Sequence, residues 1–296
     1  MFGLELMILL AIAVAAYMAW NIGANDVANA MGTSVGSGAL TLRNAIIIAA
    51  VFEFCGAFFA GDAVTDTVRK GVLVISEEEM ASLSSELQYG FIAAMLAAAL
   101  WITVATRYGL PVSTTHSILG GIIGFGLFID PSLVDFHKVG QIVLSWVISP
   151  LLGGVLAYGT FTVIRMTIME SDDPIQRSRW MAPILAFPTF FVLALALQFK
   201  ALKYLLPAAW LPAKDCAVDA SFMAAVAECL PLPSLQIALL LGAFASLSLY
   251  LLLRNYEFKE EGYAGVESIF VWLQIITACY VAFAHGANDR SNAIGP

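Results

Sequence analysis

Eight apolar runs divide the chain, and their length restricts the fold more than any other feature. A helix that crosses a bilayer needs ~20 apolar residues. Runs of this kind occupy residues 4–35, 44–64, 89–107, 112–129, 139–168, 181–199, 234–253 and 267–296. Hydrophobic residues make up 60% of the chain and charged residues 12%, and the mean hydropathy is +0.85. These values lie outside the range of soluble proteins, so we predict an all-α, polytopic integral membrane protein.

The charged residues lie mainly between the apolar runs. The net charge of −8 provides no basic patch, which argues against binding to nucleic acid. Lys and Arg divide evenly between the two predicted faces, so the positive-inside rule does not orient the chain. One face carries most of the acidic residues and a loop containing Cys216 and Cys229, which can pair in an oxidising compartment. We therefore expect that face, which includes the N-terminus, to lie outside the cytoplasm of a bacterial inner membrane.

A polar motif occurs twice in otherwise apolar surroundings. The stretch "WNIGANDVANA" begins at Trp20 and "FAHGANDRSNAIGP" begins at Phe283, and Gly23–Gly32 and Gly286–Gly295 agree at seven of ten positions. An odd number of predicted crossings separates the copies, which makes them antiparallel. Secondary transporters use such inverted repeats around a site near the membrane midplane. We expect the first helix to be broken at its motif.

The runs at 89–107 and 112–129 are joined only by a tight turn that contains Gly109 and Pro111. We predict that residues 89–129 form a re-entrant helical hairpin, which would place the hydroxyl residues of its tip at membrane depth. A hairpin that crosses the membrane fully fits the sequence as well. We expect a first transmembrane repeat over 1–170. Two connecting helices follow over 171–265, with an extramembrane loop at about 200–233, and an inverted second repeat begins over 266–296.

The motif residues are candidates for a binding site. Asn21, Asn25 and Asn29 share one helix face at i, i+4 spacing, with Asp26 beside them. An ionisable group costs ~3 kcal/mol or more at the bilayer centre and is a functional candidate by default. A structural role, in which an asparagine side chain joins packed helices, accounts for one such residue but not for two copies of the motif. The second copy supplies Asn288, Asp289 and Asn292.

The stretch "PVSTTHS" (Pro111–Ser117) is typical of a helix start. Free backbone N–H groups and the positive end of the helix dipole suit an anion there. Ser113, Thr114 and Thr115 add neutral donors that suit a tetrahedral oxyanion without binding it too tightly for release. Ordinary capping needs only one of these hydroxyls. His116 fits either a titrating role or a packed one.

Two further charged residues lie inside apolar runs. Glu53 is near the middle of its run, and a buried carboxylate must be neutralised, paired or bound to a cation. We interpret it as a cation ligand or proton carrier. Arg290 stands where the first motif has Val27. The sequence leaves three possibilities open for Arg290, which are pairing with Asp289, pairing with Glu53 and exposure to water.

With these residues identified, the chain resembles the inorganic phosphate transporter family of cation-coupled phosphate symporters. "GANDVANAMG", "VFEFCGA", "GLPVSTTHSILGGIIGFGL" and "FAHGANDRSNAIGP" match its patterns in order. The resemblance implies an inverted-repeat fold that binds phosphate and coupling cations near the midplane. It differs at Arg290–Ser291, where a small apolar pair is more usual. The family also has a second "PVSTTH" hairpin after the second motif, so we expect a C-terminally truncated member or a second chain that supplies this half.

We therefore predict a secondary active transporter, not an enzyme, that moves inorganic phosphate with Na⁺ or H⁺ by alternating access and needs no other cofactor. The predicted substrate-binding residues are Asn25, Asp26, Ser113, Thr114, Thr115, Asn288 and Asp289. The predicted cation-binding or coupling residues are Asn29, Glu53 and Asn292, with Na⁺ also at Asp26 and Asp289. The expected partners are phosphate, the lipid bilayer and a second copy in a homo-oligomer. The alternatives are transport of sulfate on the same fold and an intramembrane hydrolase using Ser113 or Ser117 with His116.

Overall fold

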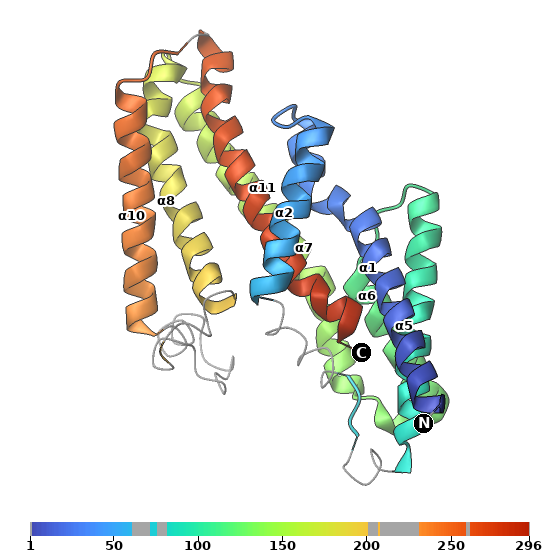
Figure 1. Ribbon diagram of the computed structural model, residues 1–296. Helices are drawn as coiled ribbons and strands as arrows, with labels where there is room; N and C mark the ends of the chain where they lie inside the picture. Colours follow the sequence, from blue (N-terminus) through green and yellow to red (C-terminus); the bar gives the residue numbers. More distant parts are fainter. Residues whose placement is uncertain are drawn as a thin grey trace. The chain divides into compact units, whose positions relative to one another are not determined.

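The computed structural model describes residues 2–60, 72–75, 82–200, 207, 231–258 and 261–295, and its regular elements are helical (Figure 1). In chain order they are α1 (Phe2–Gly36), α2 (Leu42–Ala60), α5 (Ser84–Arg107), α6 (Thr114–Ile129), the 3₁₀ turn η1 (Pro131–Leu133), α7 (Phe136–Ile164), the π-helical turn η2 (Arg165–Met169), α8 (Pro174–Lys200), α10 (Leu232–Arg254) and α11 (Gly262–Ile294). Within the described ranges, seven helices are long and apolar enough to cross a membrane. The predicted polytopic helical fold is confirmed.

The remaining predicted run, 112–129, forms the shorter helix α6. Its 16 residues reach ~24 Å at ~1.5 Å per residue, less than the ~30 Å hydrocarbon core of a bilayer. A helix of this length is too short to span that core, which favours the re-entrant form of the hairpin. Gly109 lies at the turn between the two limbs with φ +67°, a left-handed conformation that glycine adopts readily.

The predicted break in the first helix is not observed. α1 is a continuous helix of 35 residues that passes through the whole motif, and α11 is likewise helical through the second copy. The stretch contains no proline, and Gly23 keeps a negative φ. The asparagine side chains bond to neighbouring helices or to groups on their own helix, so their presence does not require the backbone to unwind.

α8 begins earlier than the predicted residue 181. Its first residue is Pro174, a favourable residue at a helix start because its missing N–H would have no partner there. The Asp173 carboxylate accepts a hydrogen bond from the backbone N–H of Gln176 at 2.9 Å, which caps the helix. Because of this cap, α8 begins within the polar stretch that separates the predicted runs 139–168 and 181–199.

The chain forms two compact units. The first contains residues 1–150 and 278–296. In it, α1 packs on α5 and α5 packs on α6, around a core that includes Met18, Ile102 and Ile118. The two limbs of the hairpin approach closely at Gly121, where an added Cβ would lie 2.7 Å from the Ala94 carbonyl oxygen. This unit contains both copies of the motif and the hairpin.

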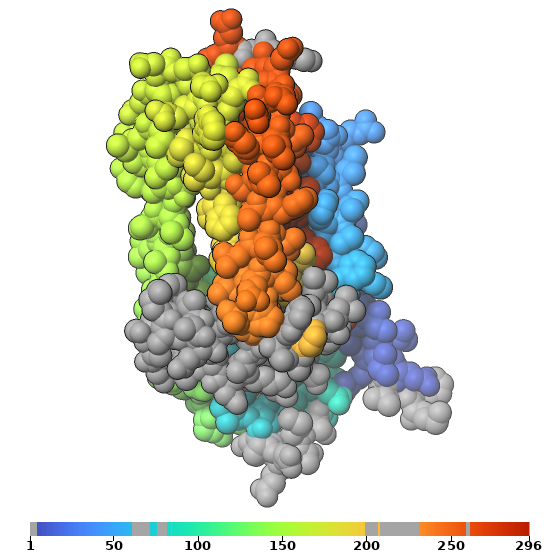
Figure 2. All heavy atoms as spheres, turned by 90° about the vertical axis from the view of Figure 1, so that its left-hand side faces the viewer, coloured from blue at the N-terminus to red at the C-terminus, as the bar shows by residue number. Residues whose placement is uncertain are grey.

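The second unit contains residues 151–277 and is built mainly on α8 and α10. The two helices lie side by side in the ribbon and space-filling views (Figure 1, Figure 2). Arg179 of α8 donates hydrogen bonds to the backbone carbonyls of Arg254 at 2.9 Å and Tyr256 at 2.8 Å. These contacts cap the C-terminal end of α10, where carbonyls have no intrahelical donor. Arg179 therefore links α8 to α10 within this unit.

Some predictions lie outside the described residues. Cys216, Cys229 and most of the predicted loop at 200–233 are among them. The division into repeats also remains a prediction, because packing units and sequence repeats need not share boundaries.

Candidate functional site

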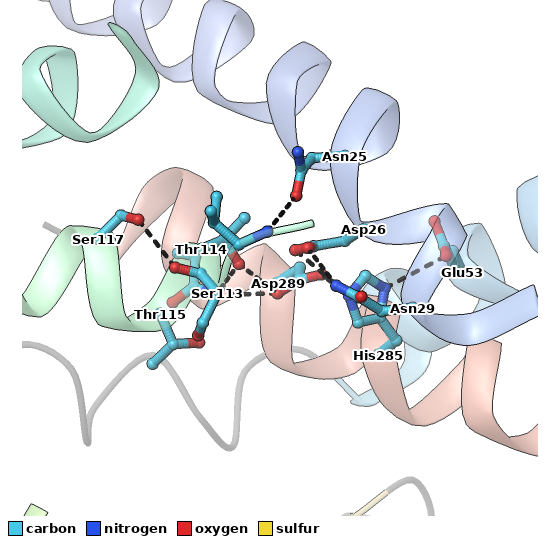
Figure 3. A network of polar contacts seen from close by, with 12 residues as sticks. Asn25, Asp26, Asn29, Glu53, Ser113, Thr114, Thr115, Ser117, His285 and Asp289 are labelled. Carbon is cyan, nitrogen blue, oxygen red and sulfur yellow. Dashed lines mark hydrogen bonds and ion pairs between the residues drawn. The ribbon is translucent and has the colours of Figure 1, made fainter. Parts of the chain in front are cut away.

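His285 lies among three carboxylates (Figure 3). Its Nε2 atom lies 2.7 Å from Asp289 Oδ2 and 3.5 Å from Asp26 Oδ2. Its Nδ1 atom lies 3.2 Å from Glu53 Oε1. The carboxylates come from α11, α1 and α2, so residues far apart in the sequence meet here. Both ring nitrogens therefore face carboxylates, and which of them donates depends on the tautomer of the ring.

The same cluster has the spacing of a cation site. Asp26 and Asp289 are only 3% and 7% exposed, and buried charges are normally paired or bound to a cation. One ligand atom from each of Asp26, His285 and Asp289 lies within 4.8 Å of the others. Carboxylate oxygens suit hard cations. The structure thus brings together the three acidic residues for which the sequence predicted cation binding.

Asn292 joins this cluster to the hairpin. Its Nδ2 atom donates to Asp289 Oδ1 at 2.9 Å, to Thr115 Oγ1 at 2.9 Å and to Thr114 Oγ1 at 3.3 Å. These three acceptors set the orientation of the amide. Its Oδ1 atom is buried and accepts no hydrogen bond from the described part of the chain. A buried acceptor in this state suits a bound cation or a protonated ligand.

The hairpin tip places hydroxyl groups beside the carboxylates. Thr114 is the first residue of α6 and is 3% exposed, and its Oγ1 atom donates to Asp289 Oδ1 at 3.4 Å. The first N–H groups of a helix have no intrahelical partner, and the positive end of the helix dipole favours an anion. The hydroxyls predicted to bind an oxyanion and the acidic residues predicted to bind a cation therefore form one connected network.

Ser113 performs the capping function that the sequence left open. Its Oγ atom accepts the backbone N–H of His116 at 3.2 Å. Ser117 donates its hydroxyl to the Ser113 carbonyl at 2.8 Å. Both hydroxyls thus bond to backbone groups of the first turn. Thr114 and Thr115 are the hydroxyl residues of this stretch that contact the second motif.

His116 is exposed but contacts an aromatic ring. Its ring lies against Trp146 of α7, with the ring centroids 3.9 Å apart and the planes tilted by 30°. Because the Ser113 and Ser117 hydroxyls bond to backbone atoms, the hydroxyl–imidazole contact that a serine hydrolase requires is not formed in the described part of the chain. The geometry gives no support to the hydrolase alternative.

Asn25 holds the turn of the hairpin. Its Nδ2 atom donates to Thr106 Oγ1 at 2.8 Å and to the Leu110 carbonyl at 3.1 Å. Its Oδ1 atom accepts the Val112 N–H at 2.9 Å. The amide bonds to backbone groups on both sides of Pro111, much as a paired peptide unit would. These contacts give Asn25 a positioning role towards the predicted substrate hydroxyls.

The other motif asparagines have separate partners. Asn21 accepts a hydrogen bond from the Thr103 hydroxyl at 2.7 Å, which ties α1 to α5. Asn29 is exposed and donates to Asp26 Oδ1 at 3.0 Å. Asn288 is partly buried, and its backbone carbonyl accepts the Ser291 hydroxyl. The three asparagines predicted to share one helix face in the first copy therefore have different partners. Asn21 contacts α5, Asn25 contacts the hairpin turn and Asn29 contacts Asp26.

His285 is the site residue that the sequence analysis did not identify. It corresponds to Ile22 in the first copy of the motif, so comparing the two copies gave no reason to select it. The available signal was its spacing: His285 is one helical turn before Asp289, and i, i+4 residues share a helix face. A lone histidine in an apolar run is ambiguous until its neighbours on other helices are known.

The chain is similar to known proteins along nearly its whole length. Residues 22–296 match the Phosphate transporter family. A protein of Pyrococcus abyssi that bears the name phosphate permease is 39% identical over 290 residues, covering 98% of this chain and 65% of its own length. A similarly named protein of Chlamydia pneumoniae is 39% identical over 288 residues, covering 95% of this chain and 66% of its own.

A solved structure, described as "The sodium-dependent phosphate transporter", is also similar. It has a TM-score of 0.79 and 34% sequence identity, and the match covers 98% of this chain and 66% of that chain. The present chain spans about two thirds of the length of each of these proteins. The family match extends over both copies of the motif and the hairpin between them. With its apolar helices, this chain is an integral membrane protein that belongs to the phosphate transporter family.

Proposed function

We propose that this protein transports inorganic phosphate together with a cation, by alternating access. The observation that carries the proposal is the connected network at the tip of the hairpin. Asn292 and Asp289 contact the Thr114 hydroxyl, and Asp289 also contacts His285. Groups that suit a tetrahedral oxyanion therefore share hydrogen bonds with groups that suit a cation.

In this proposal the phosphate is held by neutral donors. Ser113, Thr114 and Thr115 lie at the start of α6, where backbone N–H groups and the helix dipole favour an anion. Asn25 holds the turn that presents them, and Asn288 remains a predicted substrate ligand. Neutral donors stabilise the oxyanion without the permanent counter-charge that would slow its release.

The acidic residues bind the coupling cations. Asp26, Glu53 and Asp289 supply negative charge around His285, while Asn29 and Asn292 orient the aspartates. Cations bound there offset the charge of the phosphate, which lowers the cost of enclosing it in a low-dielectric site. Binding of one ion thus favours binding of the other, as symport requires.

The similar solved structure is that of a sodium-dependent transporter, which supports Na⁺ as the coupling ion here, and H⁺ is the alternative. The inverted repeat, the bacterial inner membrane, an N-terminus outside the cytoplasm and a homo-oligomeric state remain parts of the proposal.

Uptake of radiolabelled phosphate into proteoliposomes containing the purified protein tests the function. An inward Na⁺ gradient and an inward H⁺ gradient are applied separately, with protein carrying Asp289→Asn as the matched control. We expect gradient-dependent uptake by the unmodified protein alone. Absence of uptake under both gradients contradicts phosphate symport, and strong inhibition by excess sulfate favours the broader oxyanion specificity.

A further inference from the structure

α2 and α11 touch through their backbones beside the site. A Cβ added at Gly56 would lie 1.9 Å from the Phe283 carbonyl oxygen, and one added at Gly286 would lie 2.0 Å from the Glu53 carbonyl oxygen. A separation below 3.0 Å leaves no room for any side chain at either position. The two glycines therefore permit the close approach of the two helix backbones.

The same helix contact includes an ionisable pair. Glu53 of α2 lies directly beside the contact, and its Oε1 atom meets His285 Nδ1 at 3.2 Å. The other ring nitrogen, Nε2, faces Asp289 and Asp26. The position of α2 along α11 thus determines whether the Glu53 carboxylate reaches the cluster.

Arg290 forms a second tie between these helices. Its Nη1 atom donates to the Ala57 carbonyl at 3.2 Å, and α2 ends at Ala60. A cation near the C-terminal end of a helix interacts favourably with the helix dipole. The guanidinium therefore links the last turn of α2 to α11. A bond of this kind restrains the register of α2 against α11.

We propose that Arg290 is a positioning residue, which ties the last turn of α2 to α11 and so keeps Glu53 against His285. Ala57 is one helical turn after Glu53, so the bond acts close to the carboxylate it positions. The first motif has Val27 at the corresponding place, a side chain without a donor. The tie is therefore specific to the second copy of the motif. The effect on transport rests on the proposed function, whereas the effect on helix position does not.

Four variants distinguish a positioning role of Arg290 from an effect of its charge alone. Arg290→Met removes the donor and the charge, Arg290→Gln keeps a neutral donor, and Arg290→Lys keeps both in a different shape. Arg43→Met is the matched control, because Arg43 is exposed in the first turn of the same helix α2. We expect the cation concentration for half-maximal phosphate uptake to rise about tenfold in Arg290→Met, as expected for loss of a charge-assisted hydrogen bond. The KM for phosphate should change less, Arg290→Lys should restore most of the effect and Arg43→Met should match wild type.

A distance measurement tests helix position independently of transport. Spin labels are placed on the exposed positions Phe58 and Ile294 in protein from which the native cysteines have been removed. The distribution of distances between the labels should broaden with Arg290→Met and stay narrow with Arg290→Lys. An unchanged distribution with Arg290→Met overturns the positioning role, whether or not the protein transports phosphate.

A double-mutant cycle completes the test. If Arg290 acts through Glu53, combining Arg290→Met with Glu53→Gln should raise the cation requirement no further than Glu53→Gln alone. Additive effects contradict the proposal, since they show that Arg290 acts by another route. If wild-type protein takes up no phosphate, the proposed function fails, and the distance measurement still decides whether Arg290 positions α2.

Discussion

The two copies of the motif have nearly the same sequence but different surroundings. In the first copy, Asn25 bonds to backbone atoms of the hairpin turn. In the second, Asp289 and Asn292 bond to the hydroxyl groups of α6. One copy therefore holds the hairpin and the other contacts its polar tip. Repeated residues can take different roles in one site because the elements packed against them differ.

The aspartates give the largest expected difference between the copies. Asp289 lies nearer His285 than Asp26 does and also contacts Thr114 and Asn292. We expect Asp289→Asn to lower phosphate uptake about a hundredfold (~2.7 kcal/mol) and Asp26→Asn about tenfold (~1.4 kcal/mol). Initial uptake rates and thermal stability are measured on the same purified proteins.

Because an amide has nearly the shape of a carboxylate, thermal stability should stay close to that of wild type in both variants. Unimpaired uptake in Asp26→Asn removes this residue from the site. Uptake lost only together with stability shows instead that the aspartates join helices.

Replacing Asn25 tests the holding role of the first copy. Asn25→Leu keeps the size of the side chain but removes three hydrogen bonds and leaves Thr106, Leu110 and Val112 without that partner. We expect a loss of ~2 kcal/mol in the free energy of unfolding, since partly buried polar groups left without a partner are costly. Denaturant titration in detergent measures it.

Asn29→Leu is the control for Asn25→Leu. Asn29 is exposed and bonds only to Asp26 among the contacts described above, so its replacement should change stability little. Equal losses in the two variants contradict a special holding role for Asn25.

Removing a hydroxyl group at the hairpin tip should have a smaller effect on phosphate transport. Thr115→Val keeps the branched shape but removes the hydroxyl that accepts from Asn292. We expect the KM for phosphate to rise about fivefold (~1 kcal/mol), the value of one neutral hydrogen bond. The cation concentration for half-maximal uptake should change less. A shift confined to the cation requirement shows that the hydroxyl orients Asn292 and does not bind substrate.

The smallest predicted effect belongs to the cap of α6. Ser113→Ala removes the oxygen that accepts the His116 N–H, and loss of an N-cap costs ~1 kcal/mol or less of stability. Ser117→Ala is the matched control, because its hydroxyl bonds to a carbonyl within the same turn. Thermal unfolding of both variants measures the difference. A larger loss in Ser117→Ala contradicts the capping role.

Local features of the sequence were sufficient to predict the helices. Apolar run length reflects the distance across a bilayer, so the positions of α7 (Phe136–Ile164) and α10 (Leu232–Arg254) follow from residues 139–168 and 234–253. Helix ends were less predictable, because α8 extends to Pro174 through the capping contact of Asp173. The predicted break in α1 was wrong, since polar residues in a membrane helix can bond without unwinding it.

The sequence by itself determined that Asp26, Asp289 and Glu53 needed partners, because an isolated charge in a membrane is too costly to leave unpaired. Only the tertiary structure identified His285 as the group between them. It also decided that Asn25 holds a turn and that Arg290 reaches α2. The physical reason is that burial cost depends on a residue and its local surroundings, whereas hydrogen-bond partners depend on which helices cross and at what register.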